Sequence, residues 1–483
     1  MSRTTTAGHR RSLLTLLAAT CALLSACAAV GPEYRPPQLP AELSQRLQKD
    51  FDAFDARVYQ EQELPSDWWR LYADPQLDAL VSEAIAHNTD LRVAAANIET
   101  SEAVLRATQA QAGVQTQIYT PQGAPTIAYG QSSNKGVEPA GQAYGQYDIA
   151  FGISYEIDVA GRIRRTLEMN TANLQATAAA FDLARTTVVA RVVRAYGDIC
   201  SLGERLAVAR RSVELQQQSL ALLARGAAAG LYSPLDLSRS RALLAQLRAA
   251  VPSLEGQRKS ALYALAVLLG RRPEDFPPPL QACTATPQLP RPIPVGDGMA
   301  LLRRRPDVRA AERELAAATA KIGVETAALY PSVSFGAGLG TTARMGTDIL
   351  GDAAVHYSLG PVISWTLPNR QLAHARIDAA GAQERAALAR FDAQVLKALQ
   401  EAESALATYA RHLDSYRELE AACEESRRSL DIIRRREIGG AASTLDRLDA
   451  ERTLAAAESA LAAAKAQLAD DRVQIFLALG GGW

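Results

Sequence analysis

Residues 149–162 read IAFGISYEIDVAGR and decide the fold, because the spacing of their apolar residues changes along the stretch. Up to Glu156, large apolar residues alternate with small or polar ones, which is the period of a strand. From Arg162 to Ala229 no proline occurs, and apolar residues recur every three or four positions, which is the period of a helix. A strand therefore leads into a helix on the order of 100 Å long.

The same order of patterns occurs twice. Ser233-Pro234-Leu235-Asp236 is matched by Ser443-Thr444-Leu445-Asp446, and a second proline-free stretch runs from Gln371 to Ile438. A proline-dense segment at 271–294, which cannot hold a regular helix, separates the two halves. The chain is therefore predicted to be a tandem duplication. Its long, alanine-rich helices predict a tube or bundle, because each presents contact surfaces to partner helices.

Each long helix is predicted to end at a tight turn and to continue as an antiparallel partner. Glycines end the first helix of each hairpin, and Ser233 or Ser443 then caps the second. Pro234 takes the first helical position, and Asp236 or Asp446 takes the third, near the positive end of the helix dipole. These turns are predicted to be hairpin tips.

Before each long helix we predict a strand pair, which gives four strands per chain, with the least regular strand at 124–132. Runs of about ten alternating residues fit transmembrane barrel strands, with Tyr155, Tyr357 and Trp365 as interface aromatics. A soluble β-sandwich is the alternative, since its strands alternate too. Four strands cannot close a membrane barrel, and open edges are not tolerated in lipid. A barrel would therefore be shared by several chains.

The N-terminus carries a targeting pattern. Arg10 and Arg11 precede an apolar run that ends at Leu24-Ser25-Ala26-Cys27, as in a signal peptide cut before a cysteine. The run is shorter than the roughly 20 residues of a spanning helix. It resembles a bacterial lipobox, which implies lipidation of Cys27 and, with Ala28 following, sorting to the outer membrane. An ordinary secretory signal is the alternative.

Composition excludes several classes of function. The 52 basic and 52 acidic residues leave no electrostatic footprint for nucleic acid. Scattered histidines and the absence of a phosphate-binding glycine loop give no sign of an enzyme, a metal site or a cofactor. We expect Cys200, Cys283 and Cys423 to be buried free thiols, with a Cys200–Cys283 bridge as the alternative in an oxidising compartment.

The chain resembles the outer-membrane factor family, the TolC and OprM type of channel, and more closely its lipoprotein branch found with resistance-nodulation-division pumps. The resemblance covers nearly the whole chain after Cys27 and rests on the order of its motifs. These motifs are Val30-Gly31-Pro32-Glu33-Tyr34-Arg35-Pro36-Pro37, Trp68-Trp69, Asp74-Pro75-Gln76-Leu77, Tyr155-Glu156-Ile157-Asp158-Val159-Ala160-Gly161-Arg162 and Ala328-Leu329-Tyr330-Pro331-Ser332, with the duplicated modules.

The resemblance implies a mixed fold, a membrane β-barrel plus a long α-helical barrel. Each tandem-duplicated chain would contribute four strands to a 12-stranded trimeric barrel, with an α-helical periplasmic tunnel and a mixed equatorial domain. The expected parts are a lipoprotein signal peptide (1–26), a lipidated extension and equatorial segment (27–75), a first repeat (76–270), a Pro-rich equatorial linker (271–300) and a second repeat (301–483).

The resemblance also gives the tips a role as the closed periplasmic mouth, which docks onto a membrane-fusion adaptor. The matching residues are Gly230, Leu231, Ser233, Pro234, Asp236, Gly439, Gly440, Ser443 and Asp446. The family's acidic gate falls on Asp446 and Asp449, which threefold symmetry would turn into carboxylate rings. The alternative is that Asp446 only caps a helix and Asp449 is solvated.

One departure concerns how the mouth stays closed. The resemblance places Ala442 where some members of the family carry a basic residue that closes the mouth by pairing with an acid of the first tip, so a different contact is needed. Arg239, Arg241 and Arg447 are the candidates to pair with Asp236 or Asp446.

The predicted function is that of an outer-membrane exit duct of a tripartite efflux pump, which passes drugs or other small toxic compounds passively from periplasm to exterior. Its expected partners are two further copies, the adaptor, an inner-membrane resistance-nodulation-division pump and outer-membrane lipid. The alternatives are a type I secretion channel and a non-conducting structural periplasmic coiled-coil lipoprotein.

Overall fold

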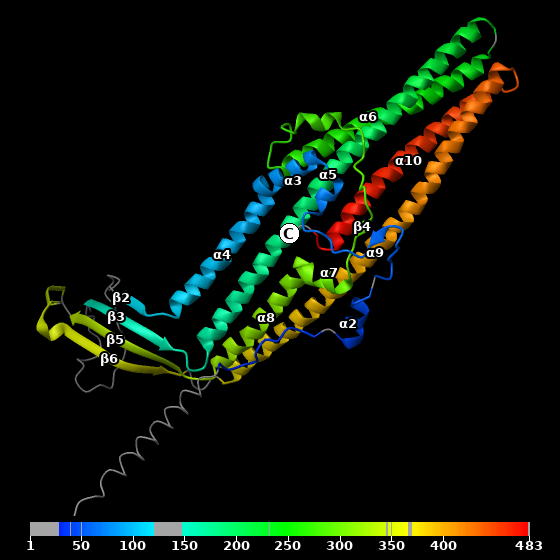
Figure 1. Cartoon of the computed structure of the whole chain (residues 1–483). Coiled ribbons are helices and arrows are strands. Elements are labelled where there is room, and N and C mark those ends of the chain that lie inside the picture. The colour runs from blue at the N-terminus through cyan, green and yellow to red at the C-terminus, as the bar shows by residue number, and fades with distance from the viewer. Residues whose placement is uncertain are drawn as a thin grey trace, which may run out of the picture. The chain divides into compact units, whose positions relative to one another are not determined.

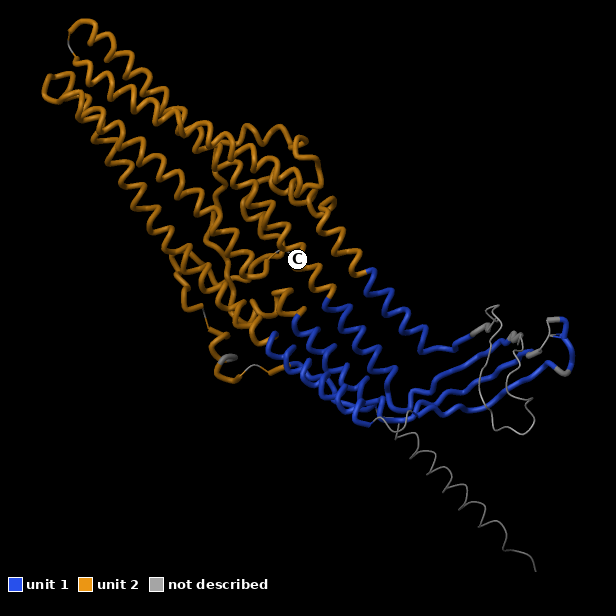
Figure 2. Tube along the Cα trace, turned by 180° about the vertical axis from the view of Figure 1, so that it is seen from behind, with its two compact units in different colours: residues 1–36, 99–176, 311–390 blue, residues 37–98, 177–310, 391–483 orange. Residues whose placement is uncertain are grey.

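The computed structural model describes residues 29–38, 40–49, 51–119, 147–230, 232–343, 346–348, 350–365 and 370–481. The predicted signal peptide, Cys27 and Leu231 lie outside these ranges. The chain forms two compact units, each assembled from separate stretches of sequence (Figure 2). Unit 1 takes Met1–Pro36, Glu99–Ala176 and Ala311–Arg390, and unit 2 takes Pro37–Ile98, Thr177–Ala310 and Phe391–Trp483.

The long helices occur as equivalent pairs from the two halves, as the duplication predicts (Figure 1). The pairs are α4 (Thr89–Gln111) with α8 (Pro306–Ala327), α5 (Arg162–Ala228) with α9 (Arg370–Ile438), and α6 (Pro234–Leu268) with α10 (Thr444–Ala478). The predicted proline-free helices are confirmed by α5 and α9. In the part of the chain that the structure describes, no helix combines the length and apolar character needed to cross a bilayer.

Shorter elements connect these helices. They are α2 (Ala41–Leu47), β1 (Tyr59–Gln60), η1 (Trp68–Tyr72), α3 (Pro75–His87), η2 (Pro278–Ala282), β4 (Ile293–Pro294), α7 (Gly298–Arg304), η3 (Gly346–Asp348) and η4 (Asp352–Ala354). The proline-dense linker contributes β4, which pairs in parallel with β1 near the N-terminus. The linker and the N-terminal segment therefore meet in unit 2.

Unit 1 contains an antiparallel sheet in the order β2-β3-β5-β6. Its strands are β2 (Gln115–Tyr119), β3 (Tyr147–Ile157), β5 (Ser332–Ala343) and β6 (Val355–Ser364). The central pair joins the two halves of the chain, because β3 comes from the first and β5 from the second. The strands predicted around Ile153, Phe335 and Tyr357 are confirmed. The one predicted at 124–132 lies outside the described residues, and β2 precedes it.

The two faces of this sheet differ in chemistry. Neighbouring strands align apolar residues in rows on one face, Phe151-Leu339-Tyr357, Ile153-Ala337-Leu359, Tyr155-Phe335-Pro361 and Ile157-Val333-Ile363. The rows of the other face are small or polar, for example Gly152-Gly338-Ser358. Tyr357 is 84% exposed and Leu359 72%, so the apolar face is uncovered within the described residues. A β-sandwich, which buries one face against a second sheet, does not fit these exposures.

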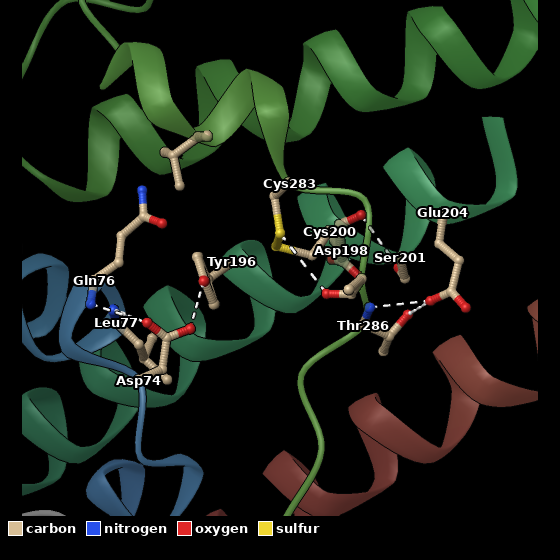
Figure 3. The surroundings of a disulfide bond; sticks show 12 residues. Asp74, Gln76, Leu77, Tyr196, Asp198, Cys200, Ser201, Glu204, Cys283 and Thr286 are labelled. Atoms are coloured by element: carbon tan, nitrogen blue, oxygen red, sulfur yellow. Dashed lines mark hydrogen bonds between the residues drawn. A yellow bond between two sulfur atoms is a disulfide. The ribbon is translucent and has the colours of Figure 1, made fainter. Parts of the chain in front are cut away.

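Unit 2 contains the main hydrophobic core. Trp68 is fully buried there, and its ring stacks on Phe476 with centroids 4.4 Å apart. Asp74 caps α3 by accepting from the backbone N–H groups of Gln76 and Leu77, and Tyr196 on α5 donates to its other oxygen (Figure 3). The Trp68-Trp69 and Asp74-Pro75 motifs therefore fix the N-terminal segment against the long helices.

Equivalent joints in the two halves use different side chains. Asn88 caps α4 and donates its side-chain N–H to the carbonyl of Leu268, at the end of α6. At the matching joint Arg305 precedes α8 and donates to the carbonyl of Ala478, at the end of α10. Both side chains are buried. The two halves therefore make the same contact between one helix start and another helix end, with Asn88 in the first half and Arg305 in the second.

Cys200 on α5 and Cys283 after η2 form a disulfide (Figure 3). The expectation of free thiols is therefore wrong for this pair, because the fold brings together two cysteines 83 residues apart. Cys423 is a free, buried thiol, as expected. The linker beside the bridge is held further by Thr286, whose backbone N–H and hydroxyl donate to Glu204 at 3.0 and 2.6 Å.

Candidate functional site

The first hairpin tip joins α5 to α6 through residues 229–233. Gly230 has a φ of +78°, in the left-handed region that favours glycine at a helix end. Ser233 caps α6: its hydroxyl accepts from the N–H of Asp236, while the Asp236 carboxylate accepts from the Ser233 N–H at 3.1 Å. Pro234 occupies the first helical position. The predicted cap is therefore confirmed at this tip.

The second tip repeats this arrangement between α9 and α10. Gly440 has a φ of +71°, and its N–H donates to the Glu437 carbonyl at 3.0 Å. Ser443 and Asp446 form the same reciprocal box, with the Asp446 carboxylate accepting from the Ser443 N–H at 2.8 Å and from its hydroxyl at 2.7 Å. Both predicted caps are thus present, and both tips belong to unit 2.

The two predicted gate residues have different surroundings. Hydrogen bonds from the hydroxyl and then the backbone N–H of Ser443 lower the pKa of Asp446 below its ordinary value. Asp449, three positions further along α10, is exposed and pairs with Arg452 at 2.5 Å. Both carboxylates are therefore solvent-accessible negative groups on the first two turns of one helix. Each also has a local partner in its own helix or cap.

A buried polar cluster that the sequence analysis did not predict lies next to the tips, at the start of α10. Arg447 is 8% exposed, and its guanidinium pairs with Glu437 on α9 at 2.7 Å and with Glu451 on α10 at 3.0 Å. It also donates to the hydroxyl of Ser219 on α5, which itself donates to Glu451 at 3.2 Å. This Arg447 cluster connects the second hairpin with the first. The four-residue spacing of Arg447 and Glu451 was its visible signal in the sequence.

The proposed pairing of Arg447 with a tip aspartate is therefore wrong. Arg447 is directed to Glu437 and Glu451, and the carboxylates of Asp236 and Asp446 bond to their own capping serines. Helix geometry explains this, because a residue at the fourth helical position points away from the cap and toward the facing helix. Ala442, where the resemblance led us to look for a basic residue, has no charge with which to form an ion pair.

The hairpin tips present charged side chains and exposed turns. Among the residues that the structure describes, no three His, Cys, Asp or Glu side chains gather as metal ligands do. What the tips present is a pair of capped turns with carboxylates on α10. Such an arrangement can attract cations or meet a complementary partner surface.

Comparison with known proteins gives the family. The sequence model of the outer membrane efflux protein family matches residues 80–271 and 299–481, which are the two halves of the chain. The probable outer membrane lipoprotein SilC of Salmonella typhimurium is 26% identical over 468 residues, covering 96% of this chain and 97% of its own. The solvent efflux pump outer membrane protein SrpC of Pseudomonas putida is 28% identical over 425 residues, covering 85% and 86%.

The fold agrees with that assignment. The solved structure of the outer-membrane channel OprN matches with a TM-score of 0.85 at 35% identity, covering 94% of this chain and 100% of that one. The family model and OprN both describe transport proteins, which is the class that the resemblance implied. The chain therefore belongs to the outer membrane efflux protein family and is an outer-membrane efflux duct protein.

Proposed function

We propose that the chain is one subunit of a trimeric exit duct, which passes drugs or other small toxic compounds passively from the periplasm to the exterior. Energy comes from an inner-membrane resistance-nodulation-division pump, coupled through a periplasmic membrane-fusion adaptor. The names of relatives such as SrpC support an efflux role for this chain. No catalytic step is needed in such a duct.

The open, two-faced sheet of unit 1 is the observation that carries the proposal. Its apolar face is exposed and its end strands β2 and β6 each have one unpaired edge within the described sheet. Exposed apolar rows are unfavourable in water, and unpaired strand edges are not tolerated in lipid unless another chain pairs with them. Three copies would supply 12 strands, enough to close a barrel with the apolar face toward lipid and the Gly152-Gly338-Ser358 side toward the lumen.

The domain organisation follows from this arrangement. Residues 1–26 are removed as the signal peptide, and Cys27 receives a diacylglyceryl anchor. Residues 27–75 and the linker 271–300 build the equatorial region, and the repeats 76–270 and 301–483 each supply strands and a helical hairpin. The β1–β4 pairing and the contacts of Trp68 support a shared region built from the N-terminus and the linker.

The tips form the periplasmic mouth and the adaptor-docking surface. Asp446 and Asp449 repeat in three copies as carboxylate rings, which favour cations and repel one another when the mouth narrows. The Arg447 cluster takes the place of the lock that Ala442 lacks, because it joins the two hairpins through Ser219. The exposed capped turns at Ser233 and Ser443 are the parts that an adaptor reaches first.

Single-channel conductance in planar bilayers tests the duct and the gate together. The purified protein is compared with Asp446→Ala plus Asp449→Ala. We expect a small cation-selective conductance in the parent, which grows and loses selectivity in the double variant. A protein that reproducibly forms no channel would contradict the duct.

The double variant also removes a helix cap, so two controls separate charge from folding. Asp236→Ala removes the same capping box at the first tip, and Ser443→Ala removes the cap while keeping the carboxylate. Each cap loss costs about 1 kcal/mol of helix stability. A gate that responds to Asp236→Ala as strongly as to the Asp446 and Asp449 pair would refute the charge assignment and leave the duct intact.

A further inference from the structure

The N-terminal segment 29–36 lies in unit 1 and contacts elements from both halves of the chain. The backbone N–H of Val30 donates to the carbonyl of Ala160, in the turn between β3 and α5, at 3.0 Å. Arg165, in the first turn of α5, donates to the carbonyls of Val30 and Gly31 at 3.1 and 3.4 Å. Arg165 is only 5% exposed and also pairs with Glu168. A buried arginine thus holds the backbone of this segment.

Three glycines allow the close approach of the segment to its site. Gly31 has a φ of +89°, and a Cβ on it would stand 2.5 Å from the Cα of Gly323 on α8. A Cβ on Gly161 would stand 2.4 Å from the Cα of Ala29, and one on Gly323 would stand 2.7 Å from Arg165. At contacts this short, a side chain on any of the three glycines would force the neighbouring backbone or Arg165 to shift. The backbone of the segment therefore packs directly against the α5 start and α8.

Tyr34 secures the other end of the segment. Its hydroxyl donates to Glu312 on α8 at 2.7 Å, and the Arg313 guanidinium lies 5.5 Å from its ring centre. Burial and then the contact with Glu312 raise the pKa of Tyr34, so the hydroxyl stays protonated as a donor. The ring also packs on the small cluster Ala172, Ala316 and Ala317, which joins α5 to α8.

We propose that residues 29–36 are a docked tether, and that the α5 start and α8 form a binding site built for it. This binding site fixes the point at which the lipid anchor enters the membrane. Only Ala28 lies between Cys27 and Ala29, and the two Cα–Cα steps from Ala29 to Cys27 span at most about 7 Å. An acyl anchor on Cys27, which rests on the proposed function, therefore enters the bilayer beside the β3–α5 turn. The membrane surface then lies at the level of residues 158–161.

Protection from the glutamyl endopeptidase Glu-C tests the docking itself. Cleavage after Glu33 releases a body that begins at Tyr34, which intact-mass spectrometry of the full-length mature protein detects. Gly31→Val and Arg165→Ala remove the fit or the hydrogen bonds. We expect each to speed this cleavage at least about tenfold, because charge-assisted hydrogen bonds of this kind hold the segment closed. Tyr34→Phe, which keeps the ring, should give a smaller increase.

Arg162→Ala is the matched control. Arg162 is the first residue of α5, three positions before Arg165; its side chain is half exposed and pairs with Glu156. It should leave the cleavage rate unchanged. Equal rates in all variants and the parent would overturn the docked tether. Channel conductance is measured separately. A protein that conducts, but in which the parent and all variants are cleaved after Glu33 at the same rate, would refute this inference and leave the proposed duct intact.

A spin label tests the membrane level. Val159 is 43% exposed in the β3–α5 turn, and Val104, 51% exposed on α4, serves as the control in the same unit. In vesicles, a label on Val159→Cys should show the oxygen accessibility of the bilayer surface, and one on Val104→Cys that of water. A water-like signal at Val159 with normal conductance would contradict the proposed position of the membrane surface. It would leave the docked tether and the duct uncontradicted.

Discussion

Arg447 illustrates how one side chain links sequence-distant helices near the candidate mouth. Its charge is matched by Glu437 and Glu451, and Ser219 supplies the contact to the other hairpin. Buried ion pairs of this kind contribute little beyond an apolar replacement, but removing one partner leaves an uncompensated charge. The cluster therefore makes the separation of the hairpins sensitive to a single residue.

Replacing Arg447 with Met removes the cation that pairs with Glu437 and leaves Glu451 with the longer contact to Arg434, at 3.4 Å. We expect a loss of about 3 kcal/mol in local stability, which is about a hundredfold in the opening equilibrium. Hydrogen exchange of residues 430–455 measures it directly. Arg428→Met, which removes an exposed pair with Glu424 and Glu425, should change exchange by well under tenfold. Equal effects of both replacements would contradict the buried role of Arg447.

The pH dependence of the proposed gate follows from the hydrogen bonds that Ser443 gives to Asp446. Ser443 lowers the pKa of Asp446 below its ordinary 3.8, so the cap's contribution is complete above pH 3.8 and is lost as the pH falls through the lower folded value. In an Asp449→Asn background, cation selectivity should persist below pH 3.8. Ser443→Ala should raise the pH at which half of the cation selectivity is lost, whereas Ser233→Ala should not. Reversal potentials against pH provide the measurement.

At the scale of elements, the ends of the helices were predictable because local chemistry sets them. Prolines, glycines and capping serines placed both long helices within one residue of their observed ends. The alternation of apolar residues likewise placed β3, β5 and β6. In contrast, the Cys200–Cys283 bridge and the contacts of Arg447 with Glu437 and Ser219 depend on which helices lie side by side. The spacing of residues along the chain does not contain that information.

The disulfide holds the linker to α5 across 83 residues of chain. Removing it with Cys200→Ser plus Cys283→Ser should cost about 2–4 kcal/mol, because a long loop regains its freedom in the unfolded chain. The shift of the thermal unfolding of unit 2, followed by circular dichroism with and without reductant, measures this loss. Cys423→Ser is the control, and the parent should lose stability with reductant while the double variant should not respond.

At the scale of the whole molecule, duplication explains why one chain carries two hairpins and two strand pairs. The strands of the two halves pair centrally through β3 and β5, which leaves β2 and β6 as edges. The sequence predicted β3, β5 and β6 but not β2, and it predicted further copies because four strands cannot form a closed barrel. The docked tether was not predicted, since its site is built by glycines that gain meaning only when α5 and α8 are adjacent.

Crosslinking of the sheet edges tests the shared barrel most directly. Thr116→Cys on β2 is combined with single cysteines placed along β6 from Val355 to Ser364, and each cysteine alone is the control. After mild oxidation, at least one register should give a covalent trimer on non-reducing gels, because β2 of each copy pairs with β6 of the next and the ring closes after three. Covalent dimers alone, open-ended ladders, or no crosslink at any β6 position would contradict the trimeric barrel.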